Sequence, residues 1–107
     1  AILAKMGDRG QLGNVIVDGP LSLDVALYKE VAEHKKVKGS SVAGDPDCLL
    51  FPNIESANVF FKAASHFAGA ELAAMVMGTK VPCVLTSRGD TALTKKYSIA
   101  LACLAAR

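Results

Sequence analysis

The sequence predicts an α/β fold in which a layered sheet is covered by helices. Short apolar runs rich in valine, isoleucine and leucine alternate with longer segments whose apolar residues recur at helical spacing. Nearly continuous apolar strands that alternate with helices are typical of a sheet buried on both faces. The chain has 107 residues, of which 51% are hydrophobic, and this size fits one compact domain.

The first half of the chain is predicted to contain two helices and two strands. The helices are expected at residues 1–9 and from a cap at Ser22 or Asp24 to about residue 32, and the strands at residues 14–17 and 47–51. The strand segments are apolar and too short for helices. Glycine and proline residues separate these elements, as expected for turns and loops.

The second half contains the clearest helical pattern. Apolar residues follow the spacing i, i+3, i+7, i+10 and i+14 at Ile54, Ala57, Phe61, Ala64 and Ala68. Asn53 is placed to cap this helix and Gly69 to end it. Two more strands are expected at residues 72–77 and 81–86, and a last helix from about residue 90 to residue 106.

Charge and cysteine content favour a cytoplasmic protein that does not bind nucleic acid. The net charge is only +2, and the single basic cluster, residues 34–38, is interpreted as a solvated helix end. The cysteines at positions 48, 83 and 103 lie in separate apolar runs without a CxxC pair, so we expect buried, reduced thiols. No apolar run approaches the roughly 18 residues of a membrane span.

Polar, glycine-rich segments follow the predicted strands. They are Asp18, Gly19 and Pro20; Pro52, Asn53, Ile54 and Glu55; Gly78, Thr79 and Lys80; and Ser87, Arg88, Gly89 and Asp90. In open α/β sheets, ligands bind beyond the carboxyl ends of the strands. The sequence therefore predicts a binding site built from these segments.

Ser87, Arg88 and Gly89 carry the strongest local signal. They lie between a predicted strand and a predicted helix, where unpaired backbone N–H groups and the helix dipole favour anions. Arg88 adds a planar fork suited to phosphate, and Gly89 allows a close approach of the backbone. The alternative is that Ser87 or Asp90 only caps the helix while Arg88 points into solvent.

A polar stripe on the helix after residue 53 has two interpretations. It comprises Glu55, Asn58, Lys62 and His66. It is either a solvated face or a surface on which Asn58 and Lys62 donate to an anionic substrate. The segment of Gly78, Thr79 and Lys80 is likewise either a phosphate cradle or a plain loop. The two histidines have no partner at a metal-binding or nucleophile-activating spacing, so no metal site is expected.

Several motifs in order resemble the carboxy-terminal region of phosphate acetyltransferases and phosphate butyryltransferases, closer to the butyryl branch. They are VDGPL-x-x-D (17–24), VAGDPDCLLFPNIESAN (42–58), GTKVPCVLTSRGD (78–90) and SIAL (98–101). The resemblance implies reversible acyl transfer between coenzyme A and inorganic phosphate, with coenzyme A as a substrate and no covalently bound cofactor. It also implies two α/β domains like those of isocitrate and isopropylmalate dehydrogenases, with the active site between them. Residues 1–107 would be a single carboxy-terminal portion, and the amino-terminal portion would be absent.

The same resemblance assigns roles to individual residues. Ser87 would orient the thiol of coenzyme A, and Arg88 would bind phosphate and stabilise charge on the thioester oxygen. The residues expected to bind coenzyme A or phosphate are Asp18, Gly19, Pro20, Asn53, Asn58, Lys62, Gly78, Thr79, Lys80, Gly89 and Asp90. Some relatives carry an aspartate seven positions after the serine as the general base. Here that position is Thr94, so the base is unassigned.

The expected partners are acyl-coenzyme A, phosphate and further copies of the chain. An apolar face on the last helix, which in the family fold packs on another domain, favours association; it comprises Leu93, Tyr97, Leu101 and Leu104. Two alternatives to an enzyme portion stay open. One is a non-catalytic module that senses acyl-coenzyme A, like the domains appended to some malic enzymes. The other is an inactive, truncated fragment.

Overall fold

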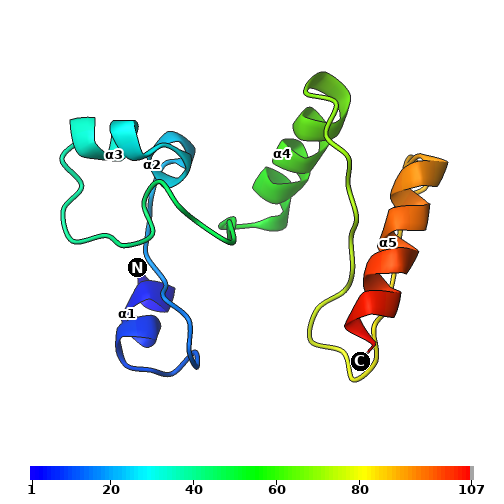
Figure 1. Ribbon diagram of the computed structural model, residues 1–107, viewed down its shortest axis with the longest axis horizontal. Coiled ribbons are helices and arrows are strands. Elements are labelled where there is room, and N and C mark those ends of the chain that lie inside the picture. Colours follow the sequence, from blue (N-terminus) through cyan, green and yellow to red (C-terminus); the bar gives the residue numbers. More distant parts are fainter. Residues whose placement is uncertain (107) are drawn as a thin grey trace. The chain divides into compact units, whose positions relative to one another are not determined.

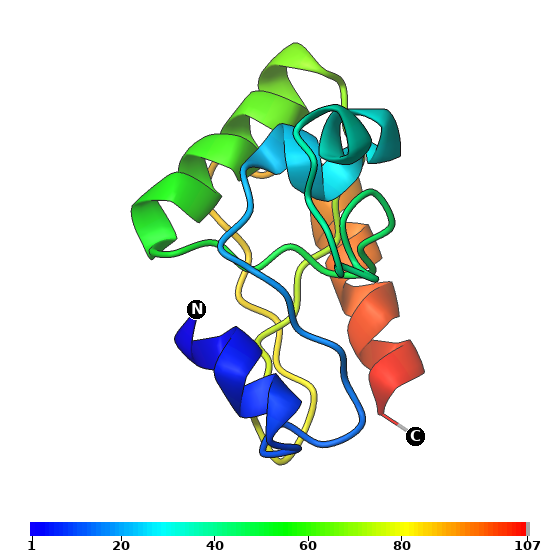
Figure 2. The same cartoon turned by 90° about the vertical axis from the view of Figure 1, so that its left-hand side faces the viewer.

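The computed structural model describes residues 1–106, and its regular structure over that range is helical (Figure 1). The chain divides into two compact units, Ala1–Leu50 and Phe51–Arg107. The first contains α1 (Ile2–Asp8), α2 (Leu23–Leu27) and α3 (Lys29–His34), and the second contains α4 (Ile54–Phe67) and α5 (Ala92–Ala105). Figure 2 shows the same elements from the side. None of the described helices is long and apolar enough to cross a bilayer.

Helix α1 confirms the helix predicted at residues 1–9. It ends at Asp8, and the chain then turns through Gly10 and Gly13, whose φ values are +67° and +75°. Glycine adopts this left-handed region without the steric cost that a Cβ atom adds. Gly10, whose N–H donates to the Gly7 carbonyl at 2.9 Å, therefore ends the helix as the sequence indicated, and Gly13 lies in the loop that follows.

The helix predicted from residue 22 to about residue 32 is instead two short helices. Tyr28 interrupts it with extended backbone (φ −122°, ψ 115°), closing α2 and opening α3. The Ala26 carbonyl, which a continuous helix would pair with the amide four residues later, accepts from the Gly44 N–H at 2.9 Å. A hydrogen bond from the loop at residues 38–46 thus replaces a local helical hydrogen bond. Helical periodicity does not indicate this contact, because its two residues are far apart in the sequence.

Helix α4 confirms both the predicted helix and its cap. The Asn53 Oδ1 accepts a hydrogen bond from the Ser56 N–H at 2.9 Å, which satisfies one of the unpaired donors of the first turn. The helix ends at Phe67, and Gly69 follows with a φ of +65°. The polar side chains of α4 are therefore held on a well-defined helix.

Helix α5 begins slightly later than predicted. Its cap is Thr91, whose Oγ1 accepts from the Thr94 N–H at 3.1 Å, so neither Ser87 nor Asp90 caps it. The buried hydroxyl of Ser98 accepts from the Ala74 N–H at 3.0 Å and donates to the Thr94 carbonyl at 2.8 Å. This side chain holds the segment after α4 against α5.

The predicted sheet is not present in residues 1–106. The segments expected as strands, residues 14–17, 47–51, 72–77 and 81–86, are not assigned as β-strands. Pairing is limited to one isolated antiparallel bridge, in which the Val76 N–H donates to the Cys83 carbonyl at 2.9 Å. A strand exists only when a neighbouring strand pairs with its backbone, and the described residues supply no such ladder. The apolar composition of these segments predicted strands, but it does not show whether a pairing partner is present.

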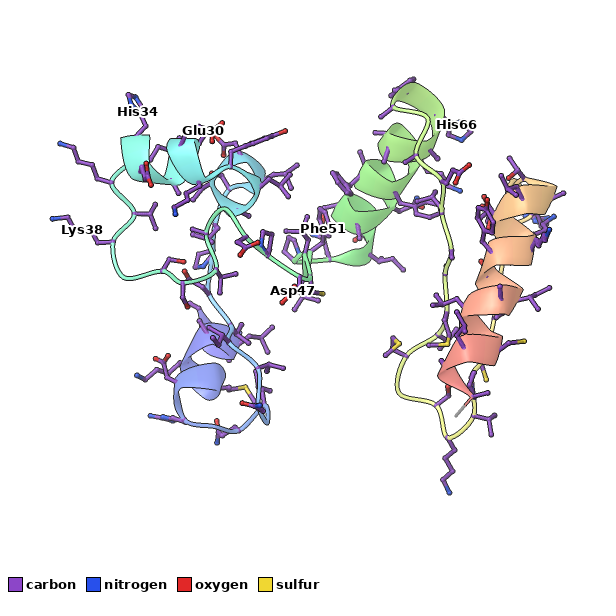
Figure 3. All side chains as sticks on the ribbon, viewed as in Figure 1. Glu30, His34, Lys38, Asp47, Phe51 and His66 are labelled. Atoms are coloured by element: carbon purple, nitrogen blue, oxygen red, sulfur yellow. The ribbon has the colours of Figure 1, made fainter. Side chains whose placement is uncertain are left out.

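Burial is correspondingly limited. Among the described residues, the buried hydrophobic side chains are Val25, Ala26 and Ala32, all in the first unit. The three cysteines are free, as predicted, but they are not buried: Cys48 and Cys103 are exposed and Cys83 is half-buried. Their burial was expected because they lie in apolar runs, and that prediction was wrong: the described residues do not pack over these runs. The basic cluster at residues 34–38 is largely exposed, as predicted (Figure 3).

Candidate functional site

Residues 87–90 form a tight turn immediately before α5. The Asp90 N–H donates to the Ser87 carbonyl at 3.1 Å, and the Asp90 Oδ2 accepts from the Ser87 N–H at 2.8 Å. The Gly89 N–H lies 3.4 Å from the Ser87 Oγ. Backbone and side-chain hydrogen bonds therefore close this turn on itself, with Ser87 and Arg88 exposed on it.

The Asp90 carboxylate also faces a lysine on α4. Its Oδ1 lies 3.7 Å from the Lys62 Nζ, and the two side chains are 9% and 37% exposed, respectively. The same ammonium lies 4.7 Å from the centroid of the Phe61 ring, a favourable position over an aromatic face. The ion pair thus joins α4 to the turn that precedes α5.

A pocket of about 250 Å³ lies beside this ion pair, within the second unit. Its wall comes from α4, from residues 69–72 and from the segment that opens α5. Both charge signs line it: Lys62 contributes a cation, and Glu71 and Asp90 contribute carboxylates. His66 also lines the pocket. Figure 3 shows His66 near the carboxy-terminal end of α4. Within residues 1–106, no three His, Cys, Asp or Glu side chains are grouped to hold a metal ion.

The structure brings together only some of the predicted binding residues. Lys62, Gly89 and Asp90 all line the pocket. Asn53 and Asn58 do not line it; the Asn53 amide oxygen caps α4, and Asn58 is exposed. A binding role for these two asparagines stays a prediction.

The segment of Gly78, Thr79 and Lys80 lies elsewhere in the second unit. It forms the turn between Val76 and Cys83, the two bridged residues. The Thr79 hydroxyl lies 2.7 Å from the Val81 carbonyl and 3.4 Å from the Val76 carbonyl. Figure 1 and Figure 2 place this turn toward the carboxy-terminal end of α5, whereas residues 87–90 lie at its amino-terminal end. The structure does not bring these two predicted segments together.

The remaining predicted segment belongs to the first unit. The Gly19 N–H donates to its neighbour's carboxylate, the Asp18 Oδ1, at 2.7 Å, and the Gly19–Pro20 peptide bond is cis. Gly19 has a φ of +149°, a conformation that residues with a Cβ atom rarely adopt. The local turn is therefore well defined, and its role in binding stays a prediction.

Sequence reasoning missed several residues that line the pocket. They are Ser65, Glu71, Thr91 and Tyr97. The position of Ser65 could have been inferred from the sequence, because Ser65 follows Lys62 by three positions on α4 and residues three or four apart share a helix face. Glu71 follows Gly69 in an irregular segment, so no periodicity indicated its position.

Nearly the whole chain matches one family model and related proteins. The family model described as phosphate acetyl/butaryl transferase matches residues 3–103. A phosphate butyryltransferase of Clostridium beijerinckii is 51% identical over 99% of this chain and 35% of its own length. A phosphate acetyltransferase of Thermotoga maritima is 50% identical over 94% of this chain and 34% of its own length.

The fold of this chain also matches part of a solved structure. The crystal structure of a branched-chain phosphotransacylase from Enterococcus faecalis V583 matches with a TM-score of 0.79 and 36% identity, over 95% of this chain and 39% of that one. The fold is therefore that of part of a phosphotransacylase. The chain belongs to the phosphate acetyl/butyryltransferase family. It spans about a third of the length of the curated relatives it matches, and the matched stretch is their carboxy-terminal region.

Proposed function

We propose that the chain is the carboxy-terminal part of an acyltransferase that moves an acyl group between coenzyme A and inorganic phosphate. The observation that carries this proposal is the family match over residues 3–103, together with about 50% identity to phosphate butyryl- and acetyltransferases. In the reaction, a phosphate oxygen bonds to the thioester carbonyl carbon and the carbon–sulfur bond breaks. The sulfur leaves with the electron pair and takes a proton, giving an acyl phosphate and free coenzyme A.

The exposed 87–90 turn supports a catalytic role for its two leading residues. Arg88 is exposed and forms no ion pair within residues 1–106, so its guanidinium is available to a phosphate oxygen. A planar fork can bind phosphate through two hydrogen bonds and stabilise charge that develops in the transition state. Ser87, one position earlier, orients the thiol of coenzyme A.

The residues proposed to bind coenzyme A or phosphate fall into two groups: those that line the pocket and those assigned from the family resemblance. Lys62, Gly89 and Asp90 line the pocket beside the turn, and we assign them to the surroundings of the substrate. The remaining assignments depend on the resemblance alone: Asp18, Gly19, Pro20, Asn53, Asn58, Gly78, Thr79 and Lys80. The general base stays unassigned, because Thr94 stands where some relatives carry an aspartate and its hydroxyl is not a base at neutral pH. That hydroxyl lies 3.0 Å from the hydroxyl of the Thr91 cap.

The complete enzyme has the two-domain architecture of isocitrate and isopropylmalate dehydrogenases. Residues 1–107 contribute a single carboxy-terminal portion, and an amino-terminal portion supplies the rest of the active-site cleft. The enzyme is a cytoplasmic homo-oligomer that uses acyl-coenzyme A and phosphate and has no covalently bound cofactor. The length of the relatives supports this proposal, since the chain spans 35% of the Clostridium beijerinckii phosphate butyryltransferase.

The test is an assay of coenzyme A release from butyryl-coenzyme A and phosphate, followed with a thiol reagent. The longer protein that contains these residues should turn over in the usual enzyme range of about 1 to 1,000 per second. The 107-residue chain alone should be inactive, because it supplies only part of the cleft.

Two results would contradict this proposal. Turnover by the verified 107-residue chain would show that no amino-terminal portion is needed. Binding of acyl-coenzyme A by the longer protein without turnover would instead identify a sensing module.

A further inference from the structure

We infer that Asp90 is a positioning residue: its carboxylate holds the 87–90 turn in shape, and Lys62 holds the carboxylate in place. The inference rests on the proposed function, because the groups that it positions are Ser87 and Arg88. The evidence is the pair of contacts made by one carboxylate, at 2.8 Å to the Ser87 N–H and at 3.7 Å to the Lys62 Nζ.

The turn depends on Asp90 at both its backbone and its side chain. The Asp90 N–H reaches the Ser87 carbonyl, and the Asp90 Oδ2 reaches the Ser87 N–H, so two hydrogen bonds join the ends of the turn. Arg88 lies between those ends and is exposed. Its backbone position is therefore set by the contacts of its neighbours. A displacement of about 1 Å at such a site can cost about 100-fold in rate.

The Lys62 ammonium explains how the carboxylate tolerates its burial. With 9% of its side chain exposed, Asp90 has lost most of its contact with water, which is costly for an unpaired charge. The opposite charge at 3.7 Å and the Ser87 N–H together offset that cost. Lys62 is on α4, 28 positions earlier, so the turn is tied to a second helix.

Two other roles for Asp90 fit the geometry less well. It is not the cap of α5, because the Thr91 Oγ1 accepts from the Thr94 N–H. It is also poorly placed to act as the general base: one oxygen accepts from Ser87, the other faces an ammonium, and little of the side chain reaches solvent. Holding the turn is the role that accounts for both contacts.

The experiment compares Asp90→Ala with Asp90→Asn in the complete enzyme. Asparagine keeps an oxygen acceptor for the Ser87 N–H, whereas alanine removes it. We expect Asp90→Ala to lower kcat by about 10- to 100-fold and to raise the phosphate KM. Asp90→Asn should lower kcat by less than about fivefold, because a neutral hydrogen bond of the same geometry remains. The matched control is Asp47→Asn, at an exposed aspartate outside the site, which should behave as wild type.

A second measurement does not depend on catalysis. With ¹⁵N-labelled serine in the complete enzyme, hydrogen exchange of the Ser87 amide should accelerate in Asp90→Ala and change little in Asp90→Asn. Lys62→Met should also accelerate it, but by less, since the hydrogen bond to Ser87 survives. Lys96→Met, at an exposed lysine of α5, is the control and should leave exchange unchanged.

The outcomes separate this inference from the proposed function. If wild type releases no coenzyme A, the proposed function fails, and an unchanged Ser87 amide in both Asp90 variants would overturn the inference independently. If wild type is active and Asp90→Ala matches it, the inference alone is overturned. If Asp90→Asn is as inactive as Asp90→Ala while its Ser87 amide stays protected, Asp90 is the general base and the positioning role is wrong. Should Asp90→Ala fail to fold, the Lys62→Met exchange result decides.

Discussion

Arg88 and Asp90 lie two positions apart in the same turn, but their surroundings differ. The Arg88 side chain is exposed and forms no ion pair within the described residues, whereas Asp90 is almost buried between Lys62 and the Ser87 amide. An exposed arginine contributes little to packing, and a buried, hydrogen-bonded carboxylate contributes to local order. At this scale the two residues therefore predict different consequences of substitution.

Substitution of Arg88 should impair catalysis and leave the fold intact. Lysine keeps the charge but not the bidentate geometry, so Arg88→Lys should raise the phosphate KM and lower kcat. Arg88→Ala should lower kcat further, by about 100- to 1,000-fold, as expected when a charge-stabilising donor is removed. Steady-state kinetics of the complete enzyme with both substrates varied is the measurement. A folded Arg88→Ala with normal kcat and phosphate KM would place Arg88 outside the site.

Asp24 should titrate at an unusually low pH. Its hydrogen bond from the Lys35 ammonium, at 2.7 Å, is the main reason that its pKa falls from 3.8 to about 2, and the Ser22 hydroxyl adds to the effect. Because the folded-state pKa is the lower one, this contact stabilises the fold above pH 3.8 and is lost as the pH falls toward 2.

A ¹³C titration of the Asp24 carboxyl carbon tests this prediction. Lys35→Met should return the midpoint toward 3.8, while Lys38→Met, at an exposed lysine nearby in sequence, should not move it. A wild-type midpoint near 3.8 would mean that the Lys35 contact does not persist in solution.

At the scale of elements, the loop at residues 38–46 determines where α2 and α3 separate. Gly44 donates to the Ala26 carbonyl and lies directly against the backbone of Lys29. A Cβ atom at Gly44 would lie 2.6 Å from the Lys29 Cα, closer than atoms of two residues can pack. Only glycine fits this contact, and its φ of +88° favours glycine as well.

Gly44→Ala should therefore destabilise the first unit, and Gly39→Ala provides a matched comparison. Both glycines have positive φ, but a Cβ atom at Gly39 would meet open space. We expect about 1 to 2 kcal/mol for Gly39→Ala from backbone strain alone, and about 2 to 5 kcal/mol for Gly44→Ala from strain and overpacking. Hydrogen exchange of the α2 and α3 amides measures both. Equal effects of the two substitutions would contradict the close packing of Gly44 on Lys29.

For the whole molecule, the balance between buried and exposed apolar surface is unusual. Large hydrophobic side chains are exposed in both units, among them Ile16, Ile54, Phe67, Leu85 and Leu104. Phe67 is 91% exposed, and the face of α5 that was expected to pack on another domain includes the exposed Leu93, Leu101 and Leu104. Exposed apolar surface on this scale is typical of a surface that associates with another protein surface.

The isolated 107-residue chain should accordingly associate into dimers or larger species, or be partly unfolded. Sedimentation velocity over a range of concentrations, combined with thermal melting followed by circular dichroism, distinguishes these states. A monomer that melts sharply would show that the exposed residues need no partner. In the proposed architecture a further portion would cover surface that is exposed here, so the complete enzyme, measured in parallel, should melt cooperatively.

Local sequence determined the features that depend on nearby residues. Helix α4, its Asn53 cap and the glycine that ends α1, Gly10, follow from helical periodicity and backbone preference, which act within a few positions. Motifs in a fixed order also identified the family, which the match over residues 3–103 confirms. The Ser87 turn was found because glycine and polar residues interrupt an apolar run.

Contacts between distant positions were decided by the tertiary structure alone. Gly44 of the 38–46 loop contacts Ala26, and Lys62 pairs with Asp90 across 28 positions. The sequence marked Lys62 and Asp90 separately as polar candidates, but no local pattern indicated that the two side chains meet. Strand pairing is equally non-local: residues 72–77 and 81–86 have strand composition, but only Val76 and Cys83 form a bridge. Composition sets what a segment favours, whereas backbone hydrogen bonds and charge pairs form only where the folded chain supplies a partner.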